Sequence, residues 1–327
     1  MRRGPYQTVT QSDIGKTSAG ENGDWLRNIL CRRVVQITIP CGACPPFSSR
    51  EDIMKNTDEL NLAECLAVCE RAARAGGAVV QDWSDRFQAR GKSRSNDLVT
   101  QADLNSQEAI RRIVLDAFPD HVFLGEEEGL GHETRGARSD DDTYRWVADP
   151  LDGTTNYVHR VPHYCVSLAM ERAGRPLVGV VYDPNRDECF AAQAGAGSWC
   201  NGERITTSGA TGLDQTLAVA GFPYDLNLES PDLKIFLDIA PRCRSVRRTG
   251  SAALNLSYIA AGRFDMYWSY STKIWDVAAG ALLVEQAGGV VTATDGGPFD
   301  LDEGHLLAAA TPELHAELLA SIRRVGA

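Results

Sequence analysis

The stretch Trp146-Val-Ala-Asp149-Pro150-Leu-Asp152-Gly153-Thr-Thr-Asn156 decides how the centre of this chain folds. Its apolar beginning predicts a strand that ends on Asp149, and Pro150 then predicts a turn. Gly153 and the two threonines predict the start of a helix, whose first backbone N–H groups have no partner within the helix and attract anions. The stretch therefore places two carboxylates beside an anion-binding helix end.

Two interpretations of this stretch are open. Carboxylates repel an anion unless a cation lies between them, and Mg²⁺ is the economical candidate because it binds carboxylates together with water and phosphate oxygens. The alternative is a solvated acidic turn in which Asp152 only caps the following helix.

Other acidic segments also lie where predicted elements begin or end. Glu126 belongs to Leu124-Gly-Glu-Glu-Glu-Gly129 at the end of an apolar strand, and Asp276 begins a helix of small residues. The segment from Lys92 to Asp103 leads into a further helix, so that Asp103 lies at its beginning. Each alone is equally a solvated loop or an ordinary helix cap. Together they supply carboxylates at four element boundaries, as a phosphoryl site with several metal ions requires.

The composition limits the class of protein. The 327 residues carry 33 Lys and Arg against 44 Asp and Glu, a formal net charge of −11. Nucleic-acid backbones and anionic lipids repel a protein of this sign, so we expect neither a general nucleic-acid binder nor a membrane-surface protein. No apolar run reaches the roughly 18 residues of a membrane span, and the first residues lack the centre of a signal peptide. We expect a soluble cytoplasmic protein.

Cysteine and histidine spacing gives no second metal motif. The nine cysteines are odd in number and scattered, which favours reduced thiols over a disulfide framework. Cys41-Gly-Ala-Cys44 has no second pair for zinc. His159 and His163 are four residues apart, but Pro162 lies between them, so we interpret both as structural.

The chain divides into three predicted regions. Residues 1–55 are rich in Gly, Ser, Thr, Pro and Asn without a sustained apolar period, which predicts a poorly ordered extension, and a translation start at Met54 is an alternative. Residues 56–207 predict an α+β half with an antiparallel sheet and most of the metal ligands. Residues 208–327 predict an α/β half that contributes Asp276 and substrate-reading segments.

Apolar periodicity predicts the elements of both halves. Residues spaced by three and four from Leu62 to Phe87 predict a helix capped by Asp58, and a second helix follows from about Gln101 to Phe118. Strands are predicted at 121–125, 143–149, 163–171, 176–183 and 188–193, with a hairpin at 197–207. Strands near 216–221, 244–249, 264–270 and 290–294 alternate with helices near 230–240, 251–261, 276–287 and after Thr311.

With these motifs the chain resembles the inositol monophosphatase family, whose members are Mg²⁺-dependent, lithium-sensitive phosphatases related to fructose 1,6-bisphosphatases. The resemblance covers about residues 58–325 and is carried by the strings DPLDGTTNxxH and WDVAAGxLLxEQAGG. It implies a layered αβαβα sandwich, usually a homodimer, with metals between the two halves. It also implies a small phosphorylated metabolite as substrate and two to three Mg²⁺ ions per subunit, without a nucleic-acid or membrane partner.

The resemblance implies metal ligands position by position. Glu126, Asp149 and the Leu151 carbonyl would hold the first ion. Asp149, Asp152 and Asp276 would hold the second, and a third, weaker ion would lie near Glu126 through water. One ion would activate a water molecule near neutral pH while the other stabilises the leaving alkoxide, without a covalent enzyme intermediate. Inhibition by lithium would follow from replacement of one divalent ion.

Other roles also follow from the resemblance. Gly153 and Thr154 would bind phosphate through backbone N–H groups. Asp103 with Thr154 would orient or deprotonate the attacking water together with Glu126. Lys92 lies in the segment that resembles the family's mobile loop over the metals.

The substrate-reading positions resemble the family less closely. Gly250, Ser251 and Ala252 resemble the segment that contacts substrate hydroxyls, and Asp152 would also reach a hydroxyl. Ser269, however, stands where inositol-specific members carry a glutamate, and loss of that charge-assisted hydrogen bond costs roughly 1.5–3 kcal/mol.

The leading hypothesis is therefore a phosphate monoesterase to be tested first on inositol 1-phosphate. A histidinol-phosphate phosphatase, or an enzyme for fructose bisphosphate or a nucleotide phosphate, is the alternative within enzymes. A catalytically weak interaction or regulatory protein is the alternative from another class.

Overall fold

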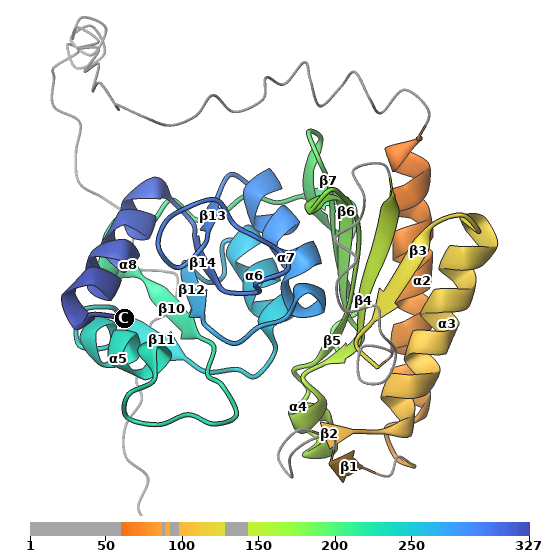
Figure 1. The fold of residues 1–327 in the computed structure, drawn as a ribbon, viewed down its shortest axis with the longest axis horizontal. Coiled ribbons are helices and arrows are strands. Elements are labelled where there is room, and N and C mark those ends of the chain that lie inside the picture. The colour runs from red at the N-terminus through yellow and green to blue at the C-terminus, as the bar shows by residue number, and fades with distance from the viewer. Residues whose placement is uncertain (1–59, 87–88, 92–97, 128–142) are drawn as a thin grey trace, which may run out of the picture. The chain divides into compact units, whose positions relative to one another are not determined.

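Two β-sheets organise the chain, one of seven strands and one of five, with helices between and outside them (Figure 1). The computed structural model describes residues 60–86, 89–91, 98–127 and 143–327, and Leu60–Ala327 form one compact unit. The interpretations of residues 1–55, of Asp58 as a helix cap, of Cys41 and Cys44, and of Lys92 in a mobile loop lie outside the described residues.

The seven-stranded sheet follows chain order in space, and all neighbours are antiparallel except β3 and β4, which run parallel. It therefore differs at one edge from the purely antiparallel sheet expected from the sequence. Its strands are β3 (Val122–Gly125), β4 (Tyr144–Asp152), β5 (Cys165–Arg172), β6 (Arg175–Asp183), β7 (Glu188–Gln193), β8 (Gly197–Cys200) and β9 (Glu203–Arg204). A separate short ribbon pairs β1 (Arg90–Gly91) with β2 (Leu98–Val99).

Helices cover both faces of this sheet. α2 (Leu62–Asp82) and α3 (Gln101–Ala117) pack on one face, where Trp146, Leu168 and Val180 are fully buried (Figure 1). Alternate residues of the same strands, among them Val147 and Val181, face the other side and pack against the central helices. The strands are almost continuously apolar because neither face is open to water.

Asn61 sets the beginning of α2. Its side chain accepts hydrogen bonds from the backbone N–H groups of Ala63 and Glu64 at 3.1 and 3.3 Å. The helix thus has an asparagine cap three residues after Asp58, the cap expected from the sequence. Both residue types are favourable helix caps, so their preference alone does not choose between them.

The five-stranded sheet is mixed. β11, β10 and β12 run parallel, and β14 and β13 are antiparallel to their neighbours. In spatial order the strands are β11 (Ser245–Arg247), β10 (Leu217–Ala220), β12 (Met266–Ser269), β14 (Leu306–Ala309) and β13 (Val290–Thr292). No strand is predicted from the sequence at β14, because its four residues are leucine and alanine, which favour helices.

The central helices complete a five-layer arrangement. α6 (Ala252–Ala260) and α7 (Ile274–Gln286) lie between the two sheets, and α5 (Pro231–Ile239) and α8 (Pro312–Val325) cover the outer face of the five-stranded sheet (Figure 1). The layered αβαβα sandwich is therefore confirmed. The remaining short helices are α4 (Thr154–Val158) and η1 (Leu213–Gln215). None of the helices in the described part of the chain is both long and apolar enough to cross a membrane.

Small residues allow α7 to pack closely between the sheets. A Cβ atom on Gly179 of β6 would lie 2.9 Å from the Cα atom of Ala279, and a Cβ atom on Gly280 would lie 2.6 Å from the Leu256 side chain. Real Cβ atoms do not approach a backbone so closely, so the helix would have to move. This contact fixes the height of α7 above the seven-stranded sheet.

Replacement of Gly179 by alanine tests this contact. We expect Gly179→Ala to lower the free energy of unfolding by about 1–3 kcal/mol, because overpacking against a helix backbone cannot relax locally. Urea unfolding would measure it, with Gly209→Ala as the matched control because a Cβ atom there meets nothing within 4 Å. Equal unfolding midpoints for the two variants would contradict the close contact.

Candidate metal and phosphate site

A bulge in β4 brings Asp149 and Asp152 to the same side of the sheet. Asp149 pairs with Ser167 of β5 and Asp152 pairs with Cys165, so β4 has one residue more than β5 between the two pairs. Side chains alternate along a regular strand, and a spacing of three would place the carboxylates on opposite faces. The extra residue of a bulge restores the same face. Both residues are buried, with exposures of 2% and 8%.

The parallel pairing of β3 with β4 places Glu126 beside this bulge. Gly125 lies opposite Ala148, and the Glu126 N–H donates to the Ala148 carbonyl at 3.0 Å. Parallel strands end at the same edge of a sheet, so the half-buried Glu126 follows β3 where Asp149 lies on β4.

Asp276 reaches the cluster from the other half of the chain. It lies in the first turn of α7, where its Oδ2 atom accepts a hydrogen bond from the Lys273 N–H at 2.6 Å. The neighbouring Trp275 carbonyl accepts from the hydroxyl of Ser167 at 3.1 Å. Since Ser167 lies opposite Asp149 on β5, this bond holds the start of α7 against the bulge.

The pKa values of Asp149 and Asp276 reflect how close these carboxylates lie to one another. Burial, followed by the charges of Glu126, Asp152 and Asp276, raises the pKa of Asp149 well above its ordinary value. Burial and then the charges of Asp152 and Glu126 raise the pKa of Asp276 in the same way. In the described part of the chain, no Lys or Arg forms an ion pair with any of the three aspartates.

Asp152 is held by three donors. Its Oδ2 atom accepts from the Ser251 hydroxyl and the Ala253 N–H, both at 2.7 Å, and the Cys165 thiol lies 3.8 Å away. Burial raises the pKa of Asp152 to about 6, although the Ser251 and Ala253 donors favour the charged form. The cap of α4 is Gly153, without a side-chain cap. The alternative in which Asp152 only caps that helix is therefore wrong.

The chemistry of this donor set fits a hard divalent cation. Four carboxylates gather there, with the buried Leu151 between Asp149 and Asp152, and oxygen atoms are the ligands that Mg²⁺ prefers. Among the described residues, no three His, Cys, Asp or Glu side chains are arranged to hold an ion as they stand. Binding would therefore include rotation of carboxylates toward a common point.

A second polar pair lies next to the cluster. Asp103 is fully buried, and its Oδ2 atom accepts from the Thr100 N–H at 2.8 Å and from the Thr100 hydroxyl at 2.6 Å. The Thr154 hydroxyl lies 3.2 Å from the Asp103 Oδ1 atom and 3.0 Å from the Leu151 carbonyl. Two residues 51 positions apart are thus brought into contact, with Asp103 in the first turn of α3 and Thr154 in that of α4.

Gly153 and Gly250 adopt backbone conformations that favour glycine. Gly153 has a φ of 99°, and a Cβ atom there would lie 3.0 Å from the His163 carbonyl. Gly250 has a φ of 88° and precedes Ser251 and Ala252, which begin α6 beside Asp152. The segment 250–252 therefore lies next to the carboxylate cluster.

Ser269 is buried and does not lie open to a substrate. It ends β12 with an exposure of 1%, and its hydroxyl oxygen accepts from the Ser271 N–H at 3.4 Å. A Cβ atom on Gly221 would lie 2.7 Å from that hydroxyl, so the β10 end covers it. The structure does not present the Ser269 hydroxyl to solvent.

For several polar residues that position the site, no role is predicted from the sequence. The Ser106 hydroxyl donates to the Pro150 carbonyl at 3.0 Å, and the Gln107 side chain accepts from the Glu127 N–H at 3.0 Å. Asn156 donates to the carbonyls of His163 and Thr249 at 2.7 and 2.8 Å. The sequence signal that could have identified Ser106 and Gln107 is their position in the helical repeat, because both lie on the buried face of α3.

Comparisons with known proteins agree with this geometry. The model of the inositol monophosphatase family matches residues 61–327. Nus factor SuhB of Pasteurella multocida is 42% identical over 262 residues, which cover 79% of this chain and 95% of that protein. Inositol-1-monophosphatase of Synechocystis is 39% identical over 264 residues, which cover 79% of this chain and 88% of that protein.

A solved structure extends the likeness to three dimensions. The inositol monophosphatase from Anabaena (Nostoc) sp. PCC 7120 matches with a TM-score of 0.70 at 38% sequence identity. The match covers 81% of this chain and 97% of that one. On the sequence match, the shared fold and the grouped carboxylates, this chain belongs to the inositol monophosphatase family.

Proposed function

We propose that this chain is a Mg²⁺-dependent phosphate monoester hydrolase whose first candidate substrate is inositol 1-phosphate. The observation that carries the proposal is the group of carboxylates between the two sheets, where burial and then the neighbouring acids raise the pKa values of Asp149 and Asp276. Asp149, Asp152 and Asp276 form no ion pair with any described residue, and like charges gathered in this way are costly to fold unless a cation binds them. Membership of the inositol monophosphatase family supports the same activity.

The proposed ligands divide between two ions. Glu126, Asp149 and the Leu151 carbonyl would hold one Mg²⁺, and Asp149, Asp152 and Asp276 would hold another. Bound Mg²⁺ supplies charge stabilisation to the phosphoryl group and lowers the pKa of a water ligand.

Asp103 and Thr154 would orient the attacking water. When the Thr154 hydroxyl directs its proton to Asp103, 3.2 Å away, its oxygen lone pairs are left to accept from water. Glu126 would accept the proton that the water loses. The backbone N–H groups of Gly153 and Thr154 would contact the phosphate.

The leaving group would bind next to Asp152. The segment Gly250 to Ala252 lies there, and Asp152 is fixed by Ser251 through the 2.7 Å hydrogen bond. A neutral, covered Ser269 supplies no charged acceptor for ring hydroxyls. We therefore infer that the enzyme accepts several polyol phosphates with little discrimination among them. Histidinol phosphate, fructose bisphosphate and nucleotide phosphates therefore remain in the substrate panel.

A regulatory or interaction role is the second candidate. The names of similar proteins favour it. Several of them, including that of Pasteurella multocida, are called Nus factor SuhB. The hydrolase remains the better supported proposal, because the chain carries an acid at every proposed carboxylate position.

Phosphate release from a panel of substrates tests the activity. With Mg²⁺ we expect release from inositol 1-phosphate or another member of the panel, which also contains histidinol phosphate, fructose 1,6-bisphosphate and 3′-phosphoadenosine 5′-phosphate. Removal of Mg²⁺ with EDTA should abolish release, and Li⁺ should reduce it. Folded protein that binds Mg²⁺ yet releases phosphate from none of them would favour the regulatory candidate.

Substitution of single carboxylates tests the ligand assignment. We expect Asp149→Asn and Asp276→Asn each to lower kcat by more than about 100-fold, because each removes a charged ligand without changing side-chain size. Circular dichroism would verify the fold, and Asp116→Asn, on the exposed surface of α3, is the matched control. Unchanged kinetics in either test variant would contradict the assignment.

The pH dependence of stability tests the burial of the Asp152 carboxylate. Asp152 has a pKa of about 6 in the folded chain and near 4 when unfolded, so the folded chain binds more protons and the free energy of unfolding falls as the pH rises through this range. Without metal, we expect wild type to lose about 2–3 kcal/mol more than Asp152→Asn between about pH 4 and pH 7. Mg²⁺ should restore the loss in wild type only. Parallel pH profiles of the two proteins in urea unfolding would contradict a pKa of Asp152 raised by burial.

A further inference from the structure

A pocket lies at the beginning of β10 and β12, at the opposite end of these strands from the carboxylate cluster. Leu217 and Asp265 line it where β10 and β12 begin, whereas Ser269 and Asp276 lie at and beyond the end of β12. Because β10 and β12 run parallel, the two sites are separated by the length of these strands, roughly 13 Å for four residues. The pocket is therefore not an extension of the carboxylate cluster.

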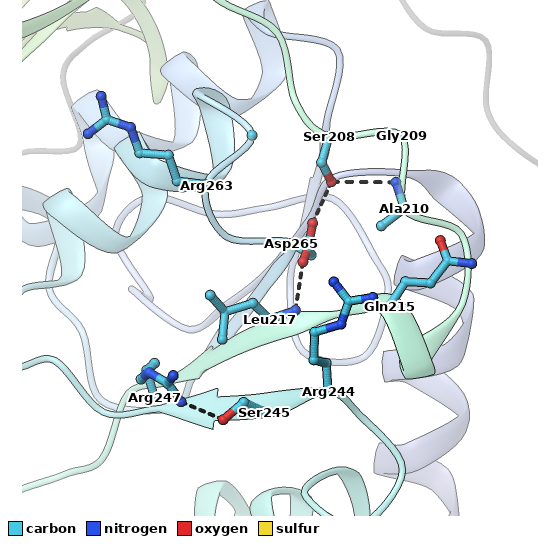
Figure 2. Close-up of a pocket in the computed structure, with 11 residues that line it drawn as sticks. Ser208, Gly209, Ala210, Gln215, Leu217, Arg244, Ser245, Arg247, Arg263 and Asp265 are labelled. Atoms are coloured by element: carbon cyan, nitrogen blue, oxygen red, sulfur yellow. Dashed lines mark hydrogen bonds between the residues drawn. The ribbon is translucent and has the colours of Figure 1, made fainter. Parts of the chain in front are cut away.

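The pocket has the size of a small-molecule site. Its volume is about 580 Å³. Its walls come from segments that are distant in sequence, namely Ser208–Ala210, Gln215 with Leu217, Arg244–Arg247, and the turn that precedes β12 (Figure 2). Hydroxyl, amide and guanidinium groups contribute to the lining.

The lining is basic although the chain carries a net charge of −11. Arg244, Arg247 and Arg263 contribute to it, against one acid, Asp265, among the described lining residues. Both oxygens of that acid are engaged within the fold: Oδ1 accepts from the Ser208 hydroxyl at 2.5 Å and Oδ2 from the Leu217 N–H at 2.6 Å (Figure 2). Asp265 is thus held in place by two neutral donors of the fold, and arginines outnumber it in the lining.

Arg263 is committed to a different contact. Its guanidinium pairs with both carboxylate oxygens of Glu188, at 2.7 and 2.5 Å, and lies over the ring of Tyr258. Figure 2 shows this side chain pointing away from the other lining residues. Its charge is balanced outside the pocket.

Arg244 and Arg247 form no ion pair with any described residue. Arg247 donates to the Ser245 hydroxyl and to the Val246 carbonyl at 3.3 Å, both of them neutral acceptors. Within the described part of the chain, the Arg244 side chain has no hydrogen-bonded or ion-paired partner. Figure 2 shows its guanidinium directed toward the part of the pocket lined by Asp265 and Gln215. Two guanidinium groups are therefore available to a ligand.

These groups define the chemistry of the ligand. Guanidinium groups bind phosphate oxygens with paired N–H donors, and the serine hydroxyls and the Gln215 amide suit further oxygen atoms. None of the described lining residues is aromatic, so the pocket lacks the stacking surface that nucleotide bases use. We propose that this pocket binds a small, non-aromatic polyanion with two or more phosphate groups.

Calorimetric titration with inorganic pyrophosphate tests the proposal. The full chain is titrated in buffer freed of metal by a chelating resin, so that the carboxylate cluster repels the anion. We expect one binding site in wild type and at least a tenfold loss of affinity in the double variant Arg244→Gln, Arg247→Gln. Arg175→Gln, which removes an exposed arginine at the start of β6, should bind as wild type does.

Three results would overturn the proposal. They are the absence of pyrophosphate binding by wild type, equal affinity of wild type and the double variant, and tighter binding of a single-stranded RNA dodecamer that depends on the same two arginines. Thermal unfolding of each variant verifies the fold. Mg²⁺-dependent phosphate release by the double variant should equal that of wild type, so this site and the proposed hydrolase can fail independently.

Discussion

The one-residue bulge in β4 is the constraint on which the candidate site depends. It places Asp149 and Asp152 on one side of a strand that would otherwise separate them. The parallel β3 then brings Glu126 to the same edge, and the bond between Ser167 and the Trp275 carbonyl brings Asp276 from the second half. The five-layer fold contributes by holding α7 between the two sheets at a height set by small residues.

Among the described residues, neutral donors rather than ion pairs hold the aspartates of the cluster. Asp152 accepts from the Ser251 hydroxyl and the Ala253 N–H, and Asp276 accepts from the Lys273 N–H. Such bonds fix the carboxylate positions and leave the charge uncompensated, as expected of a site whose cation comes from solution. In the basic pocket the arginines outnumber the acid, because Asp265 is held by two neutral donors while Arg244 and Arg247 form no ion pair with any described residue.

Much of the architecture could be predicted from sequence, because helices repeat apolar residues every three or four positions, most buried strands are apolar runs, and both end at Gly, Pro or capping residues. The acids at element ends could be named for the same reason, as with Glu126 after β3 and Asp276 at the start of α7. The bulge could not be predicted, because register belongs to a pair of strands and not to one. The cover over Ser269 escaped prediction as well, because Gly221 lies 48 positions away in the sequence and meets it only in the folded sheet.

We infer that the carboxylates around the β4 bulge bind divalent metal ions. Diffraction from crystals soaked in Mn²⁺, recorded at a wavelength where manganese scatters anomalously, is the decisive measurement. We expect anomalous peaks bounded by Asp149, Asp152 and Asp276, which disappear in crystals of Asp149→Asn. Well-ordered carboxylates without an anomalous peak at saturating Mn²⁺ would contradict it.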